Sequence, residues 1–447
     1  MQLRNGKIIQ TKVISGSSVM GSAPSVMDFA PVLYAPKKTP ESRHFTPAFL
    51  GEGTYGKVYK ISDTTIRKDC SIFDEDDENE IAGENFLEAM FLKSFDAPFI
   101  PSASRIKANL KADKLSIFER YGGETLSVAA RRLSYAARVK LLPTIMCQMG
   151  RILMWMKRHH VAHMDIKPGN ICIDSNNNLT LIDWGFVGIV GKTEATYTGT
   201  EVFADPAYLV KDTPPISHEY DMFGMGMTIW SFIFKTYPEL DEWKEILNID
   251  EKARQNYLWY LLDINEELYK DFEDFLPGTG TQMLELLLKM LDLNPEKRLR
   301  PAALYTSPLF RDLWEKYPIH TGDNHLPHHY GLSEKFSKFL KTREYENLFF
   351  LFSPNINNLA TRFFRSFSSR PESAAHDPEG IFVICLYIAD IIIQENYDFE
   401  SLPQLSHQFS KKVFLEDLIE VLEILDWKCF DSDFITLPKN FIACHYQ

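Results

Sequence analysis

The chain has 447 residues, too many for one ordinary hydrophobic core, so its length predicts two or three domains. Its 45% hydrophobic and 24% charged residues are typical of a soluble globular protein, and its formal net charge of −13 argues against nucleic-acid binding through a basic surface. The six cysteines are scattered without a C-x-x-C pair, so we expect no zinc site, no disulfide framework and an intracellular location.

The first segment, residues 1–42, is rich in Ser, Pro, Lys and Gly and lacks apolar periodicity. We interpret it as a mostly disordered leader, with docking as the alternative role, and expect no secretory signal because no continuous apolar stretch is present. From Phe45 onward the pattern is typical of β-structure. Strands are expected at 49–50, 57–61 and 64–68.

A solvated loop is predicted at the acidic run 74–78, and a helix follows over 85–95. A short strand is expected at 115–119. Beyond it the pattern is mainly helical. The clearest examples are an amphipathic helix over 141–158 and a nearly all-apolar, central helix over 222–234.

A linker containing His and Pro, residues 316–330, precedes a helical domain over 331–447. Helices are predicted near 359–367 and 414–425, with the apolar run 381–393 between them. Three such helices can form a small core, since each buried Leu, Ile or Phe contributes roughly 2 kcal/mol. The apolar run is too short to span a bilayer and contains Asp390, so we expect no membrane contact.

A glycine-rich segment lies between the first two predicted strands. It reads Gly51-Glu52-Gly53-Thr54-Tyr55-Gly56-Lys57-Val58. Alone, this G-x-G-x-x-G pattern is weak evidence, because before a helix it would indicate a dinucleotide fold. Between two strands it favours a flap whose backbone lies over phosphates.

A more specific pattern occupies residues 163–170, which read His-Met-Asp-Ile-Lys-Pro-Gly-Asn. Asp183 follows thirteen positions after Asn170, within Asp-Trp-Gly. The spacing supplies one carboxylate for a substrate hydroxyl (Asp165), one lysine for a phosphate (Lys167), and an amide with a second carboxylate for magnesium. Phosphoryl transfer from ATP needs these groups, because its catalysis is mostly positioning and charge neutralisation.

Together these motifs resemble the eukaryotic protein kinases of the serine/threonine type, and the glycine segment resembles that of the cyclin-dependent kinases. The resemblance covers about residues 45–311. It implies an α+β, two-lobed protein kinase fold over 43–315, with a small β-rich N-lobe and a large helical C-lobe, followed here by an all-α extension. It also implies ATP and Mg²⁺ as cofactors and Ser/Thr-containing proteins as substrates.

The resemblance implies a nucleotide site built largely from the glycine segment. The residues concerned are Leu50, Gly51, Glu52, Gly53, Thr54, Tyr55, Gly56, Lys57 and Val58. Lys68 would hold the α- and β-phosphates, with Arg67 as the competing register. Strand alternation favours Lys68, because Ile66 then shares its face. Glu88 would pair with the lysine from the following helix, and Glu84 is the weaker candidate.

The segment Phe118-Glu119-Arg120-Tyr121 resembles the kinase hinge, where backbone groups hydrogen-bond adenine. Glu119 and Tyr121 are therefore expected at the nucleotide, and Phe118 is expected to restrict the back of the pocket.

In the catalytic loop, the resemblance assigns Asp165 to the substrate hydroxyl and Lys167 to the γ-phosphate. Asn170 and Asp183 would hold magnesium, a hard ion that prefers oxygen ligands. Thr200 would brace both catalytic residues.

Two further residues would support this loop. Asp221, at the start of the predicted central helix, would anchor the loop backbone. His163 is expected to be a packing and orientation residue rather than a base.

The sequence departs from the family at three places. Met164 replaces the arginine that commonly receives an activation-loop phosphate, so switching by phosphorylation of that loop is in doubt. Trp184 replaces phenylalanine in the metal-binding turn. Ala207 stands where a glutamate normally pairs with Arg298, so either the docking loop is less rigid or another acid substitutes. The loop residues still open to modification are Thr193, Thr196, Tyr197 and Thr198.

The C-terminal segment resembles a divergent cyclin box, which implies an intramolecular activator that holds the Glu88 helix inward. Ile391 stands near the position of the lysine with which cyclins grip that helix, and Glu395 is a candidate for the partner glutamate. The alternative is a generic helical extension. For the whole chain, the alternative to a kinase is a pseudokinase scaffold that binds nucleotide or partner proteins without turnover.

Overall fold

The computed structural model describes residues 47–53, 56–73, 82–191, 199–206, 216–318, 334–343, 345, 348, 352–393 and 411–430. The predicted leader, the acidic run and most of the predicted linker lie outside this set. All described elements belong to one compact unit that spans Phe45–Gln447. Within the described ranges, none of the helices has both the length and the apolarity that a membrane crossing requires.

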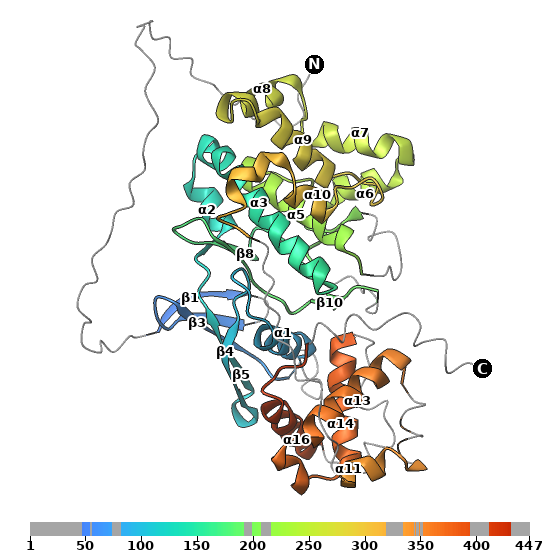
Figure 1. Cartoon of the computed structure of the whole chain (residues 1–447). Coiled ribbons are helices and arrows are strands. Elements are labelled where there is room, and N and C mark those ends of the chain that lie inside the picture. Colours follow the sequence, from blue (N-terminus) through green and yellow to red (C-terminus); the bar gives the residue numbers. More distant parts are fainter. Residues whose placement is uncertain are drawn as a thin grey trace, which may run out of the picture. The chain divides into compact units, whose positions relative to one another are not determined.

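A five-stranded antiparallel sheet forms the first part of the described chain (Figure 1). In sheet order its strands are β1 (Ala48–Gly53), β2 (Gly56–Lys60), β3 (Thr65–Cys70), β5 (Lys114–Arg120) and β4 (Ala103–Asn109). The predicted strands correspond to β1, β2, β3 and β5, whereas β4 was not predicted. The glycine segment includes the end of β1 and the start of β2, which pair as a hairpin at one edge of the sheet.

The register of β3 against β5 decides which side chains face the helical part. Lys68 lies opposite Ile117, and Ile66 lies opposite Glu119. Side chains that are directly opposite in an antiparallel pair share a face of the sheet. Lys68, Ile66 and Glu119 therefore point to the same side of the sheet.

Helix α1 (Gly83–Ser94) packs beside this sheet and is buried around most of its circumference. Nine of its twelve residues are buried, from Asn85 through Leu92 and Ser94. A helix without an exposed polar face needs cover on more than one side. One side contacts β4 and β5, and another contacts the C-terminal helix α14 (Pro378–Ile393).

The larger helical part is built around α5 (His218–Phe234), in which thirteen of seventeen residues are buried, as expected for the predicted central helix. Helix α3 (Tyr135–Arg158) packs against it. Its remaining helices are α2 (Leu126–Arg132), α6 (Leu240–Asn248), α7 (Glu251–Leu261), α8 (Glu266–Phe275), α9 (Gly280–Met290), α10 (Pro301–Tyr305), and the 3-10 helices η2 (Glu201–Phe203) and η3 (Pro308–Leu313). A further 3-10 helix, η1 (Leu110–Ala112), connects β4 to β5 in the sheet.

Two small sheets hold the loops that carry the polar motifs. One consists of β6 (Glu124–Thr125), β8 (Ile171–Ile173) and β9 (Leu179–Leu181). The other pairs β7 (Val161–Ala162) with β10 (Gly188–Ile189). The loop 163–170 thus runs from β7 to β8, and the turn with Asp183 runs from β9 to β10, so the pairing brings both loops together.

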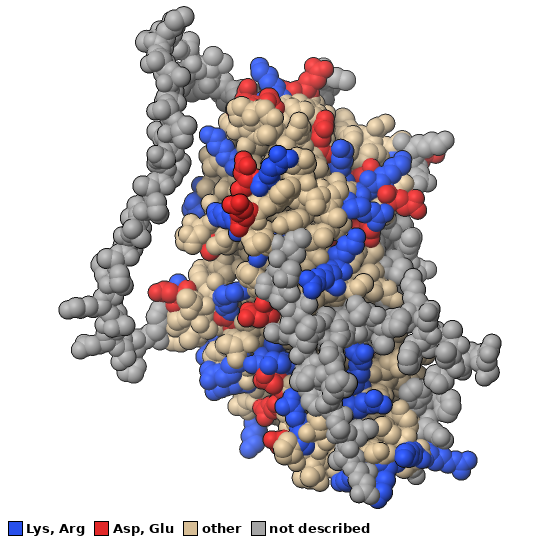
Figure 2. Space-filling view, viewed as in Figure 1, with Lys and Arg blue, Asp and Glu red and all other residues tan. Residues whose placement is uncertain are grey.

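The C-terminal helices form a cluster around α14, where thirteen of sixteen residues are buried. It contacts α11 (Glu334–Phe339), α13 (Pro354–Ser368) and α16 (Lys411–Ile424) (Figure 1). A short 3-10 helix, η4 (Pro371–Ala375), precedes α14. The predicted α+β fold, two lobes with a helical extension, is confirmed. On the face drawn in Figure 2, basic and acidic side chains are interspersed over the described surface.

Candidate active site

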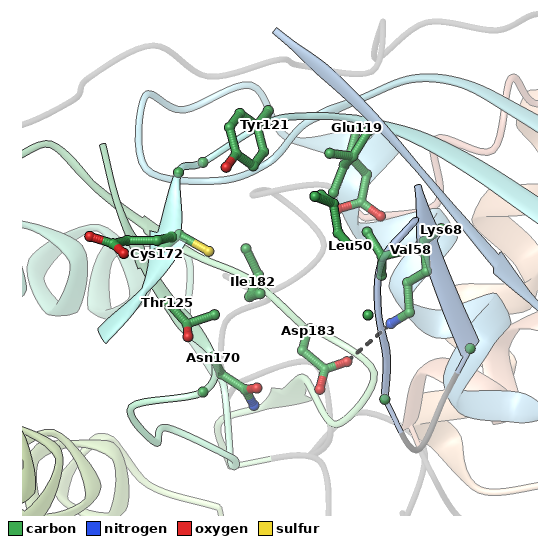
Figure 3. Close-up of a pocket in the computed structure, with 18 of the residues that line it drawn as sticks. Leu50, Val58, Lys68, Glu119, Tyr121, Thr125, Asn170, Cys172, Ile182 and Asp183 are labelled. Atoms are coloured by element: carbon green, nitrogen blue, oxygen red, sulfur yellow. Dashed lines mark hydrogen bonds and ion pairs between the residues drawn. The ribbon is translucent and has the colours of Figure 1, made fainter. Parts of the chain in front are cut away.

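A cavity of about 460 Å³ lies between the five-stranded sheet and the loops of the helical part (Figure 3). Of the predicted nucleotide-site residues, Lys57 does not line it, and Thr54 and Tyr55 lie outside the described residues. Those that line it are Leu50, Gly51, Glu52, Gly53, Gly56, Val58, Lys68, Glu88, Glu119 and Tyr121. Lys57 instead lies on the surface, with its Nζ 3.6 Å from a carboxylate oxygen of Glu52.

One wall of the cavity carries a buried cluster of charges. The Lys68 Nζ lies 2.5 Å from Glu88 Oε2 and 3.1 Å from Asp183 Oδ1. Burial acts to lower the pKa of Lys68, but Glu88, Asp183 and Glu119 together raise it well above its ordinary value. Burial acts to raise the pKa of Asp183, but the charge of Lys68 outweighs it and lowers that pKa. Lys68 is therefore a fixed cation.

The alternative candidates for this ion pair, Arg67 and Glu84, do not point toward the charge cluster. The Arg67 guanidinium lies 2.9 Å from Asp69 and stacks over the Tyr59 ring, on the other face of the strand. The Glu84 backbone and Cβ lie near Gly185 rather than near the lysine. The expected pairing of Lys68 with Glu88 is thus the one that the fold brings together.

The catalytic-loop residues lie together around Asp165, which is buried at 4% exposure. Lys167 Nζ donates to Asp165 Oδ2 at 2.6 Å and to Thr200 Oγ1 at 2.8 Å. Asn170 Nδ2 donates to Asp165 Oδ2 at 2.9 Å. The Thr200 backbone N–H and hydroxyl both donate to Asp165 Oδ1 at 2.9 Å. Each oxygen of the carboxylate is therefore held by two donors.

The backbone of this loop is fixed by Asp221 at the start of α5. Its two carboxylate oxygens accept from the N–H groups of His163, at 2.7 Å, and Met164, at 3.0 Å. Burial raises the pKa of Asp221 to about 7, although both N–H donors act to lower it. Met164 has a φ of 68°, a conformation that L-residues rarely adopt, so the loop needs this anchor.

A glycine makes the approach of Thr200 feasible. A Cβ built on Gly199 would lie 2.6 Å from the carbonyl oxygen of Met164. Real Cβ atoms do not come so close to backbone, so a side chain here would displace Thr200 from Asp165.

His163 behaves as a packing residue. It is fully buried, its Nε2 lies 3.0 Å from the carbonyl oxygen of Ile182, and its ring packs edge-on against Trp184. Burial lowers the pKa of His163, which favours the neutral form of the ring. Trp184 in turn stacks on Phe91 of α1 with 4.3 Å between ring centroids, and its Nε1 donates to the Leu181 carbonyl.

Asn170 and Asp183 face one another across the cavity floor (Figure 3). Since the Asn170 amide nitrogen donates to Asp165, its oxygen is left for a ligand. Within the described ranges no group of three or more His, Cys, Asp or Glu could hold a metal ion. Two protein oxygens suit Mg²⁺, which usually keeps waters and phosphate oxygens as its other ligands.

Comparison with known proteins agrees with this geometry. The family model described as "Protein kinase domain" matches residues 46–310. The chain belongs to the protein kinase superfamily. The predicted family is thereby confirmed, and the C-terminal helices lie beyond the matched residues.

Individual kinases are similar at low identity. CTD kinase subunit alpha of Saccharomyces cerevisiae is 24% identical over 294 residues, covering 60% of this chain and 55% of that protein. Cyclin-dependent kinase-like 1 of Caenorhabditis elegans is 23% identical over 283 residues, covering 58% and 78%. Mitogen-activated protein kinase 13 of Pan troglodytes is 26% identical over 177 residues, covering 36% and 48%. The chain thus spans about half the length of the first and third of these relatives.

The back of the kinase pocket differs from the prediction. Phe118 does not line the cavity, because it lies on the opposite face of β5, where the Arg105 guanidinium stacks 4.1 Å from its ring centroid. Glu119 takes the inward position instead and is 4% exposed. The prediction that Phe118 restricts the pocket is therefore wrong. The pairing of Ile66 with Glu119 fixes this register.

The partner of Arg298 is also resolved. Its guanidinium forms a fully buried ion pair with Asp205 and donates to the Glu219 carbonyl at 2.6 Å. Of the two alternatives, substitution by another acid is the correct one, and Arg298 does not lack a partner. Ala207 itself lies outside the described residues, as do the modifiable loop residues of 193–198.

Several residues that line the kinase pocket were not among the predicted set, including Thr125, Val128, Cys172 and Ile182. Cys172 and Ile182 lie next to the motifs in sequence, two positions after Asn170 and one before Asp183. Adjacency was the available signal for these two. Val128 and Thr125 come from the start of α2, and no motif indicates them.

Proposed function

We propose that this protein kinase is catalytically active and transfers the γ-phosphate of ATP to Ser or Thr hydroxyls of proteins, with Mg²⁺ as cofactor. The observation that carries the proposal is the joint placement of Asp165 with its four donor contacts and of Lys68 with Glu88 and Asp183. A scaffold that only binds partners has no need for both clusters to be complete.

In the proposed reaction, Asp165 orients the substrate hydroxyl and accepts its proton, since its carboxylate is held at a fixed position by Lys167, Asn170 and Thr200. Lys167 and Lys68 supply positive charge near the phosphates. Asn170 and Asp183 would hold Mg²⁺, which neutralises phosphate charge when bound. Lys167, two residues after Asp165, is the choice that resembles the serine/threonine type.

The test compares incorporation of radiolabelled phosphate from ATP into a protein substrate by the wild type and by Asp165→Ala. We expect Asp165→Ala to lose about 10²–10⁴-fold in rate, the usual contribution of a positioned acid–base group, while still binding nucleotide. Asp312→Ala, which removes an exposed carboxylate, serves as the control and should retain full activity. Equal incorporation by wild type and Asp165→Ala would refute the assignment, and binding without incorporation by wild type would favour the pseudokinase scaffold.

We further infer that the helical domain, residues 331–447, stabilises the kinase domain, residues 43–315, in cis. The support is a set of contacts to the outer side of α1. The Phe430 N–H donates to Ser94 Oγ at 3.0 Å, and the Trp427 and Phe430 rings pack against Phe86 and Phe91. Because α1 carries Glu88, these contacts would keep the Lys68 partner in place, the role that the resemblance to a cyclin box implies.

The residue at position 164, a methionine, is consistent with control through the position of α1. Its side chain is 6% exposed within an apolar cluster that includes Phe186 and Tyr220. At this position the chain offers no cation for a loop phosphate. Control through the position of α1 therefore fits this chain better than control through loop phosphorylation. The proposed partner glutamate, Glu395, lies outside the described residues.

A further inference from the structure

The inner end of the pocket carries an acid that the proposed reaction does not use. Glu119 is 4% exposed, lines the cavity, and its side chain points into it (Figure 3). Its Oε1 has no hydrogen-bond partner among the residues that the structure describes. A buried polar atom without a partner costs free energy, so its retention calls for an explanation.

An ion pair within the protein does not supply that explanation. The nearby cation, Lys68, already contacts Glu88 at 2.5 Å and Asp183 at 3.1 Å. The other charges close to Glu119 are those same two carboxylates, which are of like sign. Burial, and then Glu88, raise the pKa of Glu119 well above its ordinary value, so the pocket contains a carboxyl group that is not matched by a free cation.

The chemistry of Glu119 limits what can meet it. A carboxyl without a matching cation repels phosphate, so the part of a ligand next to Glu119 is uncharged or carries N–H donors. A carboxyl oxygen accepts from an N–H group whether or not the carboxyl is protonated. The adenine end of ATP offers such a group, the exocyclic amine.

We propose that Glu119 is a specificity-determining residue that accepts a hydrogen bond from the exocyclic amino group of the bound purine. The inference rests on the proposed function, because it takes ATP as the nucleotide. Glu119 lies on β5 just before Arg120 and Tyr121, which also line the cavity. The Glu119 carboxyl is thus placed to accept a hydrogen bond from the amine, while backbone groups of the following residues contact the rest of the base edge.

The test measures binding by calorimetry rather than turnover. Dissociation constants of ATP and of purine riboside triphosphate, which has hydrogen in place of the amine, are measured with Mg²⁺ for wild type and Glu119→Leu. The dissociation constant of purine riboside triphosphate divided by that of ATP gives the discrimination ratio. This ratio should be about tenfold larger in wild type than in Glu119→Leu, the factor that one hydrogen bond to such a group supplies. Backbone contacts to the amine contribute equally to both proteins and cancel in this comparison.

Two matched variants make the comparison specific. Glu119→Gln keeps an acceptor oxygen at the same length and should retain most of the discrimination. Cys172→Ala enlarges the same pocket from β8 without touching the carboxyl, and its ratio should equal that of wild type. If Glu119→Leu does not fold, as judged by its melting curve, Glu119→Met replaces it.

An unchanged ratio in the apolar variant would overturn the inference while leaving the proposed function intact. An equal fall of the ratio in Cys172→Ala would also overturn it, because pocket shape and not the carboxyl would then be responsible. Failure of wild type to bind either nucleotide would instead remove the proposed function, and with it this inference.

Discussion

The catalytic loop and helix α1 deliver groups to the same pocket, but they are positioned by different means. The loop is held by residues of the helical lobe, chiefly through the two hydrogen bonds that its backbone donates to Asp221 and the contact of His163 with the Ile182 carbonyl. Helix α1 is covered by a segment far away in sequence, because Ser94 is bonded to Phe430, 336 positions later. One half of the site contacts mainly its own lobe, and the other also contacts a separate group of helices.

The two regions also differ in the kind of interaction that holds them. Around the loop the contacts are hydrogen bonds to buried charges, which specify direction and distance. On the outer side of α1 they are mainly aromatic: Phe86 with Trp427 and Phe91 with Phe430, with ring centroids 5.8 Å and 5.3 Å apart. Apolar contacts depend on area and are non-directional, so we expect α1 to be the part of the site that shifts most readily.

The largest effect is expected from breaking the loop anchor with Asp221→Ala. The N–H groups of His163 and Met164 would lose their acceptor inside a fully buried site, costing about 1–3 kcal/mol each. Displacement of Asp165 by even 1 Å would lower the rate by about 10²-fold. Urea unfolding and initial phosphorylation rates measure both effects.

Asp221→Asn is the matched control for that change, because it keeps one acceptor oxygen for the two N–H groups. It should fall between wild type and Asp221→Ala in both stability and rate. Full activity of Asp221→Ala would show that the loop holds its geometry without this helix, and would remove the distinction drawn between the two regions.

The sequence predicts site residues of both regions, because each belongs to a short motif or a regular element. Asp165, Lys167 and Asn170 lie within six positions, so they form one motif that is recognised without knowledge of the fold. Lys68 and Glu88 belong to a strand and a helix recognised from their patterns and motifs. The motifs and elements that carry these residues are short-range features, which residue spacing records.

What the sequence did not predict depends on pairing between distant segments. Strand β4 is an edge strand with exposed Arg105 and Lys107, so it lacks the apolar alternation of a half-buried strand. Both Phe118 and Glu119 were expected at the pocket, but only Glu119 faces inward, because the register with β3 decides which of these two neighbours does so. The pairing of Arg298 with Asp205 spans 93 positions and has no local signature.

A smaller effect is expected from uncovering α1 with Trp427→Ala. Trp427 is 4% exposed, so truncation of its ring should cost about 3 kcal/mol of stability. If α1 then shifts, the Lys68–Glu88 pair lengthens, and we expect the phosphorylation rate to fall by about tenfold. Hydrogen exchange should increase in residues 83–94 while remaining unchanged in the loop 163–170.

Val413→Ala provides the control, because Val413 lies on α16 and is 45% exposed. It should alter neither the rate nor exchange in α1. A Trp427→Ala protein with wild-type activity would contradict the proposal that the helical domain acts in cis. Equal increases of exchange in both regions would show that they are not positioned independently.

The smallest effect is expected from Lys93→Ala, which removes the ion pair between α1 and the C-terminal segment. Lys93 Nζ lies 3.3 Å from Asp426 Oδ1, but the Asp426 side chain is 54% exposed and also lies 2.9 Å from Lys428. Exposed pairs of this kind contribute under about 1 kcal/mol, so the rate should stay within about twofold of wild type.

The contribution of the Lys93–Asp426 pair to stability should depend on pH. Burial acts to raise the pKa of Asp426, but Lys428 and Lys93 lower it below its ordinary value. A carboxyl with a lowered folded-state pKa contributes stability that is present above its unfolded pKa and is lost as pH falls through the folded pKa. The stability difference between wild type and Lys93→Ala, measured by urea unfolding, should therefore be constant from about pH 6 to 8 and shrink only in acid, below the unfolded pKa of about 3.9. A loss of activity in Lys93→Ala as large as that in Trp427→Ala would mean that charge, and not apolar cover, holds α1 against the sheet.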